Sequence, residues 1–157
     1  HFEALRIERR QGRAKGIDVM IGTVRDEVHA FFINNEAVAN IDRAGMAAAL
    51  KGSARVAGMG NAEAVVDTYA KRLPKAAAPA LFAAIRTDGM FRLPSLRFAD
   101  AQEKHARAYV YRFDWQPTVD APYGAAHCIE IATRSIMLPM IAGIALSSST
   151  SRRGFVE

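Results

Sequence analysis

The chain has 157 residues, of which 50% are hydrophobic, 24% charged and 8% aromatic. Single domains commonly hold about 100–150 residues, so this length allows one hydrophobic core, and the composition excludes an intrinsically disordered chain. The formal net charge of +5 does not indicate a nucleic-acid-binding protein, because the excess charge is diffuse, arises near the two ends, and is not interleaved with stacking aromatics.

The first predicted element is a strand over residues 17–22, an apolar run that ends in glycine and is typical of a parallel strand buried on both faces. Residues 28–87 are rich in alanine, and their apolar residues recur at helical spacing. Three or four helices are expected there. Asn34-Asn35, residues 58–60 and Leu73-Pro74 are the predicted breaks between them.

A further helix is predicted over residues 94–107, with Pro94 in its first turn, where a missing backbone N–H needs no partner. It leads into a strand over residues 109–114, in which aromatic and other residues alternate with a period of two. The order strand, helices, strand predicts an α/β fold. The two strands should be parallel neighbours joined by a large helical crossover.

Each predicted strand is followed by a side chain suited to catalysis: Glu27 comes after the first and His127 after the second. Sites in open α/β sheets lie at the carboxyl ends of the strands, so we expect these two residues to meet there. A carboxylate and an imidazole are two parts of a hydrolase that attacks through a serine. No serine of the chain has the Gly-x-Ser-x-Gly setting, and no two glycines are adjacent to form an oxyanion loop.

Other residues compete for these roles. Asp26 is the rival acid, and we expect it to be solvated or to cap a helix. His29 and His105 are expected to be surface residues, and the aromatic residues Phe31 and Phe91 to belong to the core. Cys128 is adjacent to His127, but neighbouring residues of an extended chain point apart, which argues against a Cys-His pair.

Four segments in order carry a resemblance to a known family: residues 17–27, 91–99, 108–115 and 124–131. They resemble, in turn, the strand and acid-bearing turn, a helix entry, the last core strand and the histidine loop of the type B carboxylesterases, the cholinesterase-like branch of the α/β-hydrolases. The chain departs from the family at Val28, where glycine commonly follows the acid. The likeness covers residues 15–131 and is lost in the tail over residues 132–157.

The resemblance implies that residues 1–157 form part of an α/β-hydrolase domain, its C-terminal portion, because a complete domain of this family is several times longer. A shifted reading frame is our hypothesis for the atypical tail. Comparing the three frames of the coding sequence tests it, since a family-like continuation in another frame is required.

The function implied is that of a carboxylic-ester hydrolase fragment, with Glu27 and His127 as the acid and histidine of a Ser-Glu-His triad. The serine is expected upstream of His1, and the 157 residues alone are expected not to hydrolyse esters. A small-molecule ester is the implied partner, with no cofactor and no metal. The alternative is a non-catalytic interaction module, because some cholinesterase-like domains are adhesion proteins without turnover.

Location and association follow from the remaining features. Cys128 is the single cysteine, which rules out an intrachain disulfide and favours a reducing compartment, so we expect a cytoplasmic protein. The apolar run over residues 136–146 is broken by Pro139 and is shorter than the ~20 residues of a transmembrane helix, so no membrane partner is expected. Two strands alone leave a sheet edge through which the chain can associate.

Overall fold

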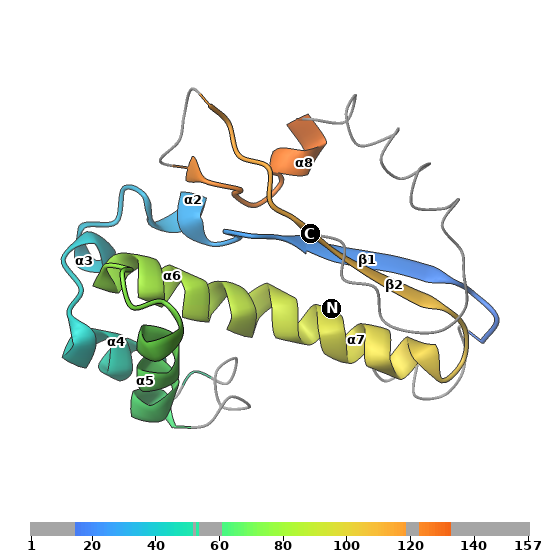
Figure 1. The fold of residues 1–157 in the computed structure, drawn as a ribbon, viewed down its shortest axis with the longest axis horizontal. Helices are drawn as coiled ribbons and strands as arrows, with labels where there is room; N and C mark the ends of the chain where they lie inside the picture. Colours follow the sequence, from blue (N-terminus) through green and yellow to red (C-terminus); the bar gives the residue numbers. More distant parts are fainter. Residues whose placement is uncertain (1–14, 52, 54–60, 119–122, 133–157) are drawn as a thin grey trace.

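The computed structural model describes residues 15–51, 53, 61–118 and 123–132 (Figure 1). Its elements are β1 (Val19–Val24), α2 (His29–Phe32), α3 (Glu36–Ala39), α4 (Arg43–Leu50), α5 (Ala62–Arg72), α6 (Ala78–Thr87), the π-helical turn η2 (Asp88–Arg92), α7 (Leu93–Glu103), β2 (Ala108–Phe113) and α8 (Ile129–Ala132). The predicted break at residues 58–60 and, except for Ala132, the atypical tail lie outside the described residues.

The two strands are parallel neighbours, and they pair in register from Val19 opposite Ala108 to Val24 opposite Phe113. The predicted α/β fold, two parallel strands joined by a large helical crossover, is therefore confirmed. Both strands run toward the end of the sheet at which α2 lies (Figure 1). The segments that leave them consequently emerge at one edge, which is the geometry that parallel pairing imposes.

The first strand lies two residues later than predicted, because Gly22 does not end it. Gly22 stands opposite Tyr111, whose ring lies so close that a Cβ on Gly22 would be 2.3 Å from the ring. Glycine is thus the residue that lets the tyrosine ring lie across β1. The expected burial on both faces holds at the carboxyl end, where Val24 is 2% exposed, but not at Met20, which is 40% exposed.

We expect Gly22→Ala to lower the free energy of unfolding by about 1–3 kcal/mol, because the new methyl group overpacks against Tyr111. Urea unfolding followed by circular dichroism measures this change. In a Tyr111→Ala background the ring is gone, so Gly22→Ala should cost little there. An undiminished cost in that background would contradict the steric explanation.

The crossover ends in one long helical segment that runs beneath the sheet and comprises α6, η2 and α7 (Figure 1). Pro94 lies in the first turn of α7, as predicted, but no helix begins there: Thr87, Asp88, Arg92 and Leu93 all have right-handed helical backbone angles. The Leu93 N–H bonds to the carbonyl of Asp88, five residues back. This wider turn accommodates a proline that would clash inside a regular α-helix. The helix ends at Glu103, four residues earlier than predicted.

The described part of residues 28–87 contains five helices, α2 to α6, and not three or four, because the first stretch is divided into the single turns α2 and α3. The predicted breaks at Asn34-Asn35 and Leu73-Pro74 are confirmed. Side chains cap three of the helices: Asn35, Asp42 and Asn61 each accept the N–H of the residue three positions later.

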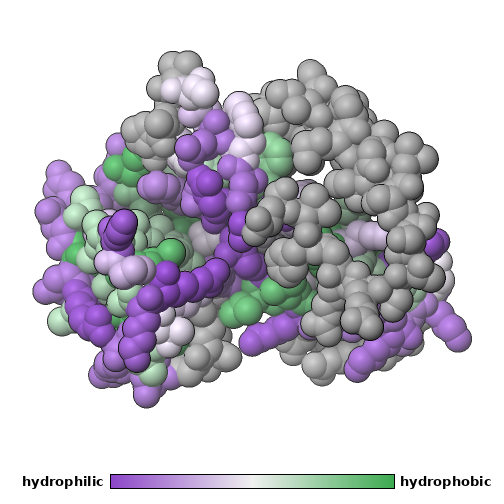
Figure 2. Space-filling model, viewed as in Figure 1, coloured by the Kyte–Doolittle hydropathy of each residue, from purple (hydrophilic) through white to green (hydrophobic). Residues whose placement is uncertain are grey.

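These helices enclose a core that is separate from the sheet. It is built of buried side chains from α3 to α6, among them Val38, Met46, Leu50, Val66, Phe82 and Ile85. Hydrophilic residues dominate the outer surface of this helical part, with smaller hydrophobic areas between them (Figure 2). The packed helices thus hold the end of α6 and the turn η2 beside the carboxyl edge of the sheet.

Candidate active site at the carboxyl edge of the sheet

We call residues Val24 to Glu27 the acid turn: it comprises the last residue of β1 and the three residues that follow the strand. Glu27 is 4% exposed, and its Oε1 accepts the backbone N–H of Val24 at 2.9 Å. A buried carboxylate is costly unless it is hydrogen-bonded. The bond across the turn meets part of this requirement and holds the carboxylate at the end of the strand.

The second component is the histidine loop, residues 123–127, which lies against the acid turn. Asp26 donates its backbone N–H to the carbonyl of Ala125 at 2.9 Å, and its Oδ2 accepts the Ala125 N–H at 2.9 Å. Gly124 has a φ of +61°, a left-handed conformation that glycine adopts without steric cost. These contacts bring His127 to the acid turn from far along the sequence.

Glu27 and His127, the two predicted site residues, are in contact: Oε2 of the carboxylate lies 2.6 Å from Nδ1 of the imidazole, across 100 sequence positions. The His127 side chain is 39% exposed, whereas the Glu27 side chain is 6% exposed. A carboxylate at Nδ1 selects the tautomer with its proton on that nitrogen. The other ring nitrogen, Nε2, then has a free lone pair and can accept a proton.

Two aromatic rings lie beside the imidazole. The ring centroids of Phe31 and Phe91 are 5.7 Å and 5.1 Å from that of His127. Phe31 comes from α2 and is 55% exposed, so the expectation that it is a core residue is wrong. Phe91 belongs to η2, so this π-helical turn of the long helix faces the candidate site. The sequence carries no local signal for either contact.

The competing candidates have other surroundings. The Asp26 side chain is 28% exposed and does not cap α2, whose N-cap residue is Val28; its carboxylate binds the Ala125 N–H and Nε of Arg25. His29 and His105, which follows α7 in a turn, are both half-buried, so neither is as fully exposed as a typical surface residue. Cys128 is exposed and has a φ of +66°, which is uncommon for a residue other than glycine.

A buried polar network supports the acid turn from below. Asp88, on the π-turn, accepts hydrogen bonds from the hydroxyl of Tyr69 and from Nη1 of Arg92, while Nη2 of Arg92 donates to the carbonyl of Arg25 at 3.3 Å. Burial, and then the hydrogen bond to the negatively charged Asp88, raise the pKa of the Tyr69 hydroxyl above its ordinary range. The network joins α5, the long helix and the acid turn, and sequence analysis did not find it.

The Tyr69 shift predicts a loss of stability at alkaline pH. The pKa of the Tyr69 hydroxyl is raised in the folded state. Its contribution to the free energy of unfolding is therefore complete below the unfolded pKa of about 10 and is lost as the pH rises above that value. We expect the free energy of unfolding to fall more steeply above about pH 10 in the unsubstituted chain than in Tyr69→Phe. Tyr109→Phe, on the exposed face of the sheet, is the control and should keep the steep fall.

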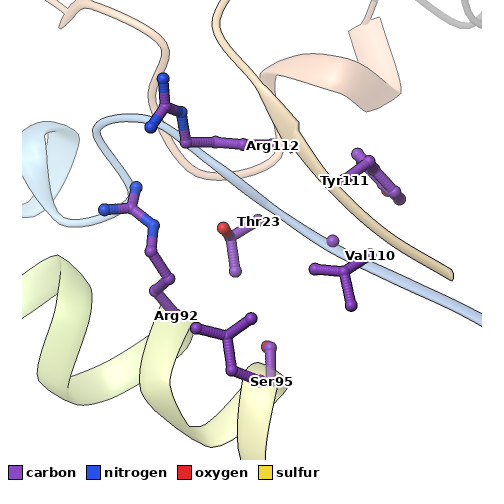
Figure 3. Close-up of a pocket in the computed structure, with 8 residues that line it drawn as sticks. Thr23, Arg92, Ser95, Val110, Tyr111 and Arg112 are labelled. Carbon is purple, nitrogen blue, oxygen red and sulfur yellow. The ribbon is translucent and has the colours of Figure 1, made fainter. Parts of the chain in front are cut away.

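A separate hollow lies between the strands and the long helix (Figure 3). Arg92 and Ser95 extend into it from the helix, and Thr23 and Val110 point toward it from the strands (Figure 3). Glu27 and His127 do not line this hollow. It belongs to the packing between sheet and helix, and the carboxylate and imidazole lie beyond it at the carboxyl edge.

Within the described ranges, no three His, Cys, Asp or Glu side chains come together as a metal site would require. None of the helices in this part of the chain has the length and apolar character needed to cross a membrane.

The chain matches no protein-family model. It is 34% identical over 122 residues to para-nitrobenzyl esterase of Bacillus subtilis (strain 168), a match that covers 77% of this chain and 22% of that protein. Among solved structures, one of PNB esterase has a TM-score of 0.53 at 27% identity and covers 93% of this chain and 28% of its own. Another structure of PNB esterase has a TM-score of 0.49 at 25% identity and covers 87% of this chain and 27% of its own. The chain therefore spans about a quarter of the length of these relatives.

Proposed function

Because this chain is homologous to para-nitrobenzyl esterase, of the type B carboxylesterase family with the α/β-hydrolase fold, we propose that it supplies two members of a Ser-Glu-His triad that hydrolyses carboxylic esters. Glu27 is the acid and His127 the base. The observation that supports this most strongly is the 2.6 Å contact between a buried carboxylate oxygen and Nδ1 of a half-exposed imidazole. In this proposal the chain is the C-terminal portion of the domain, and the serine lies on a segment outside its 157 residues.

The residues present define the proton transfers. As the serine oxygen attacks the ester carbonyl, Nε2 of His127 takes the serine proton, and the carbonyl electron pair moves to its oxygen. His127 then returns that proton to the departing alcohol. Water attacks the acyl-enzyme by the same two steps and releases the acid. The Glu27 carboxylate keeps the imidazole oriented and stabilises the positive charge that the ring acquires.

The same proposal implies that the substrate is a small-molecule carboxylic ester. A cytoplasmic location is a separate expectation, which rests on the single cysteine. In the described residues the sheet has two strands, so each has an unpaired edge. We expect these edges to pair with the rest of the sheet of the domain, or with another chain when the rest is missing.

The test supplies the missing serine. The 157-residue chain alone should not hydrolyse p-nitrophenyl acetate or be labelled by a fluorophosphonate, since losing a triad nucleophile costs on the order of 10⁶ in turnover. A chimera in which residues 15–131 replace the matching segment of Bacillus subtilis para-nitrobenzyl esterase should do both. A folded chimera that neither hydrolyses p-nitrophenyl acetate nor binds the fluorophosphonate covalently overturns the proposal. That result favours the non-catalytic interaction module.

A further inference from the structure

Asp26 joins the acid turn to the histidine loop by two hydrogen bonds to one residue, Ala125. It satisfies both backbone groups of Ala125: its N–H donates to the Ala125 carbonyl, and its Oδ2 accepts the Ala125 N–H, each at 2.9 Å. Nε of Arg25 also donates to Oδ2, at 3.0 Å, and Nη2 of Arg25 donates to the side chain of Gln116 at 2.6 Å. The carboxylate is therefore oriented from two sides.

The loop is shaped to receive this carboxylate. A Cβ on Gly124 would lie 2.6 Å from Oδ2 of Asp26, so no side chain fits there while the carboxylate keeps its place. Ala125 and Ala126 are 0% and 5% exposed, so in the folded chain the Ala125 N–H depends on the Asp26 carboxylate for a partner. Loss of this acceptor removes the side-chain bond that holds the loop against the acid turn.

We propose that Asp26 is a positioning residue that sets the contact between His127 and Glu27. His127 lies two residues beyond Ala125, so the two Asp26 bonds determine where the imidazole sits relative to the buried carboxylate. Glu27 cannot move to follow a displaced ring, because its Oε1 is held by the Val24 N–H at 2.9 Å. The inference rests on the proposed function only in the catalytic consequence of this contact, since the contact itself can be measured without turnover.

The test compares Asp26→Ala with Asp26→Asn in the 157-residue chain labelled uniformly with ¹⁵N. The far-downfield proton on Nδ1 of His127 reports its hydrogen bond to Glu27, and His127→Gln assigns the signal. Asp26→Ala should abolish the signal and speed hydrogen exchange at the Ala125 amide by about tenfold to a hundredfold. Asp26→Asn keeps an oxygen that can accept the Ala125 N–H, so it should retain the signal.

Asp18 offers a matched control. Its carboxylate also accepts a backbone N–H, that of Arg107 at 3.1 Å, and binds the Arg107 side chain, but at the amino end of the same strands. Asp18→Ala removes a comparable set of bonds and should leave the His127 signal unchanged. Loss of the signal in both variants would indicate general loosening and overturn the proposal.

The outcomes separate the positioning role from the proposed function. Retention of the Nδ1 signal in Asp26→Ala overturns the positioning role, even if that variant unfolds more easily, and so does loss of the signal in Asp26→Asn. In the chimera, Asp26→Ala should lower kcat about a hundredfold with little change in KM, as expected for a misplaced base. A chimera without esterase activity in which Asp26→Ala still abolishes the signal contradicts the proposed function alone.

Discussion

Replacing His127 by glutamine in the chimera should lower kcat by about 10⁶, which is the largest effect we expect from any single substitution in this chain. Glutamine has nearly the size of histidine and can still bond to Glu27, so the carboxylate keeps a partner. It cannot accept the serine proton or return it to the leaving alcohol. Hydrolysis of p-nitrophenyl acetate under saturating substrate measures kcat, and fluorophosphonate labelling should slow in parallel.

The control for this substitution is His105→Gln. His105 precedes β2 at the amino end of the sheet, and its carbonyl, not its ring, accepts the Gly16 N–H at 3.2 Å. We expect full activity in this variant. A loss of less than tenfold in His127→Gln, with the protein still folded, would show that another group acts as the base.

Glu27→Gln should lower kcat by about 10⁴ with little change in KM. The glutamine oxygen can still accept the Val24 N–H, so the acid turn should keep its shape. Its amide N–H₂ then faces Nδ1 of His127, which must become the acceptor. The imidazole proton is thereby placed on Nε2, where the ring cannot take a proton from serine.

Two measurements separate this tautomer effect from a loss of structure. Urea unfolding should show a change of less than about 1 kcal/mol, whereas the downfield Nδ1 proton of His127 should disappear. Glu63→Gln is the matched control: its carboxylate pairs with Lys51 at 3.8 Å on the surface, and both side chains are more than half exposed. Unchanged kcat in Glu27→Gln would contradict the assignment of Glu27 as the acid.

The strands and their order were predictable because their signals are local. β1 and β2 are short apolar or alternating runs with β-branched and aromatic residues, and the long helical stretch between them excludes a hairpin. Parallel pairing then places the ends of both strands at one edge. Together with the resemblance to the type B carboxylesterases, this pointed to Glu27 and His127, although neither argument could give their contact distance.

The exact extent of these elements depended on contacts between distant residues. Gly22 looks like the end of a strand in the sequence, yet the Tyr111 ring on the neighbouring strand occupies the space where a side chain would be, and β1 continues. Pro94 looks like the start of a helix, yet the π-turn before it allows the helix to pass through. In both cases the local rule for glycine or proline described the residue correctly, but the neighbouring segment decided whether the strand or helix stopped there.

The amino-acid sequence was sufficient for the α/β class and the parallel pair of strands, because spacing and turn residues encode these directly, and its resemblance to the type B carboxylesterases pointed to Glu27 and His127 as the candidate pair. It was not sufficient for the supports of that pair: the Asp26 bonds to Ala125, the left-handed Gly124, the ring of Phe91 and the network of Asp88 with Arg92. Each joins segments far apart in the chain. Such contacts arise only when the long helix packs under the sheet and the histidine loop folds back on the acid turn, and no local pattern records them.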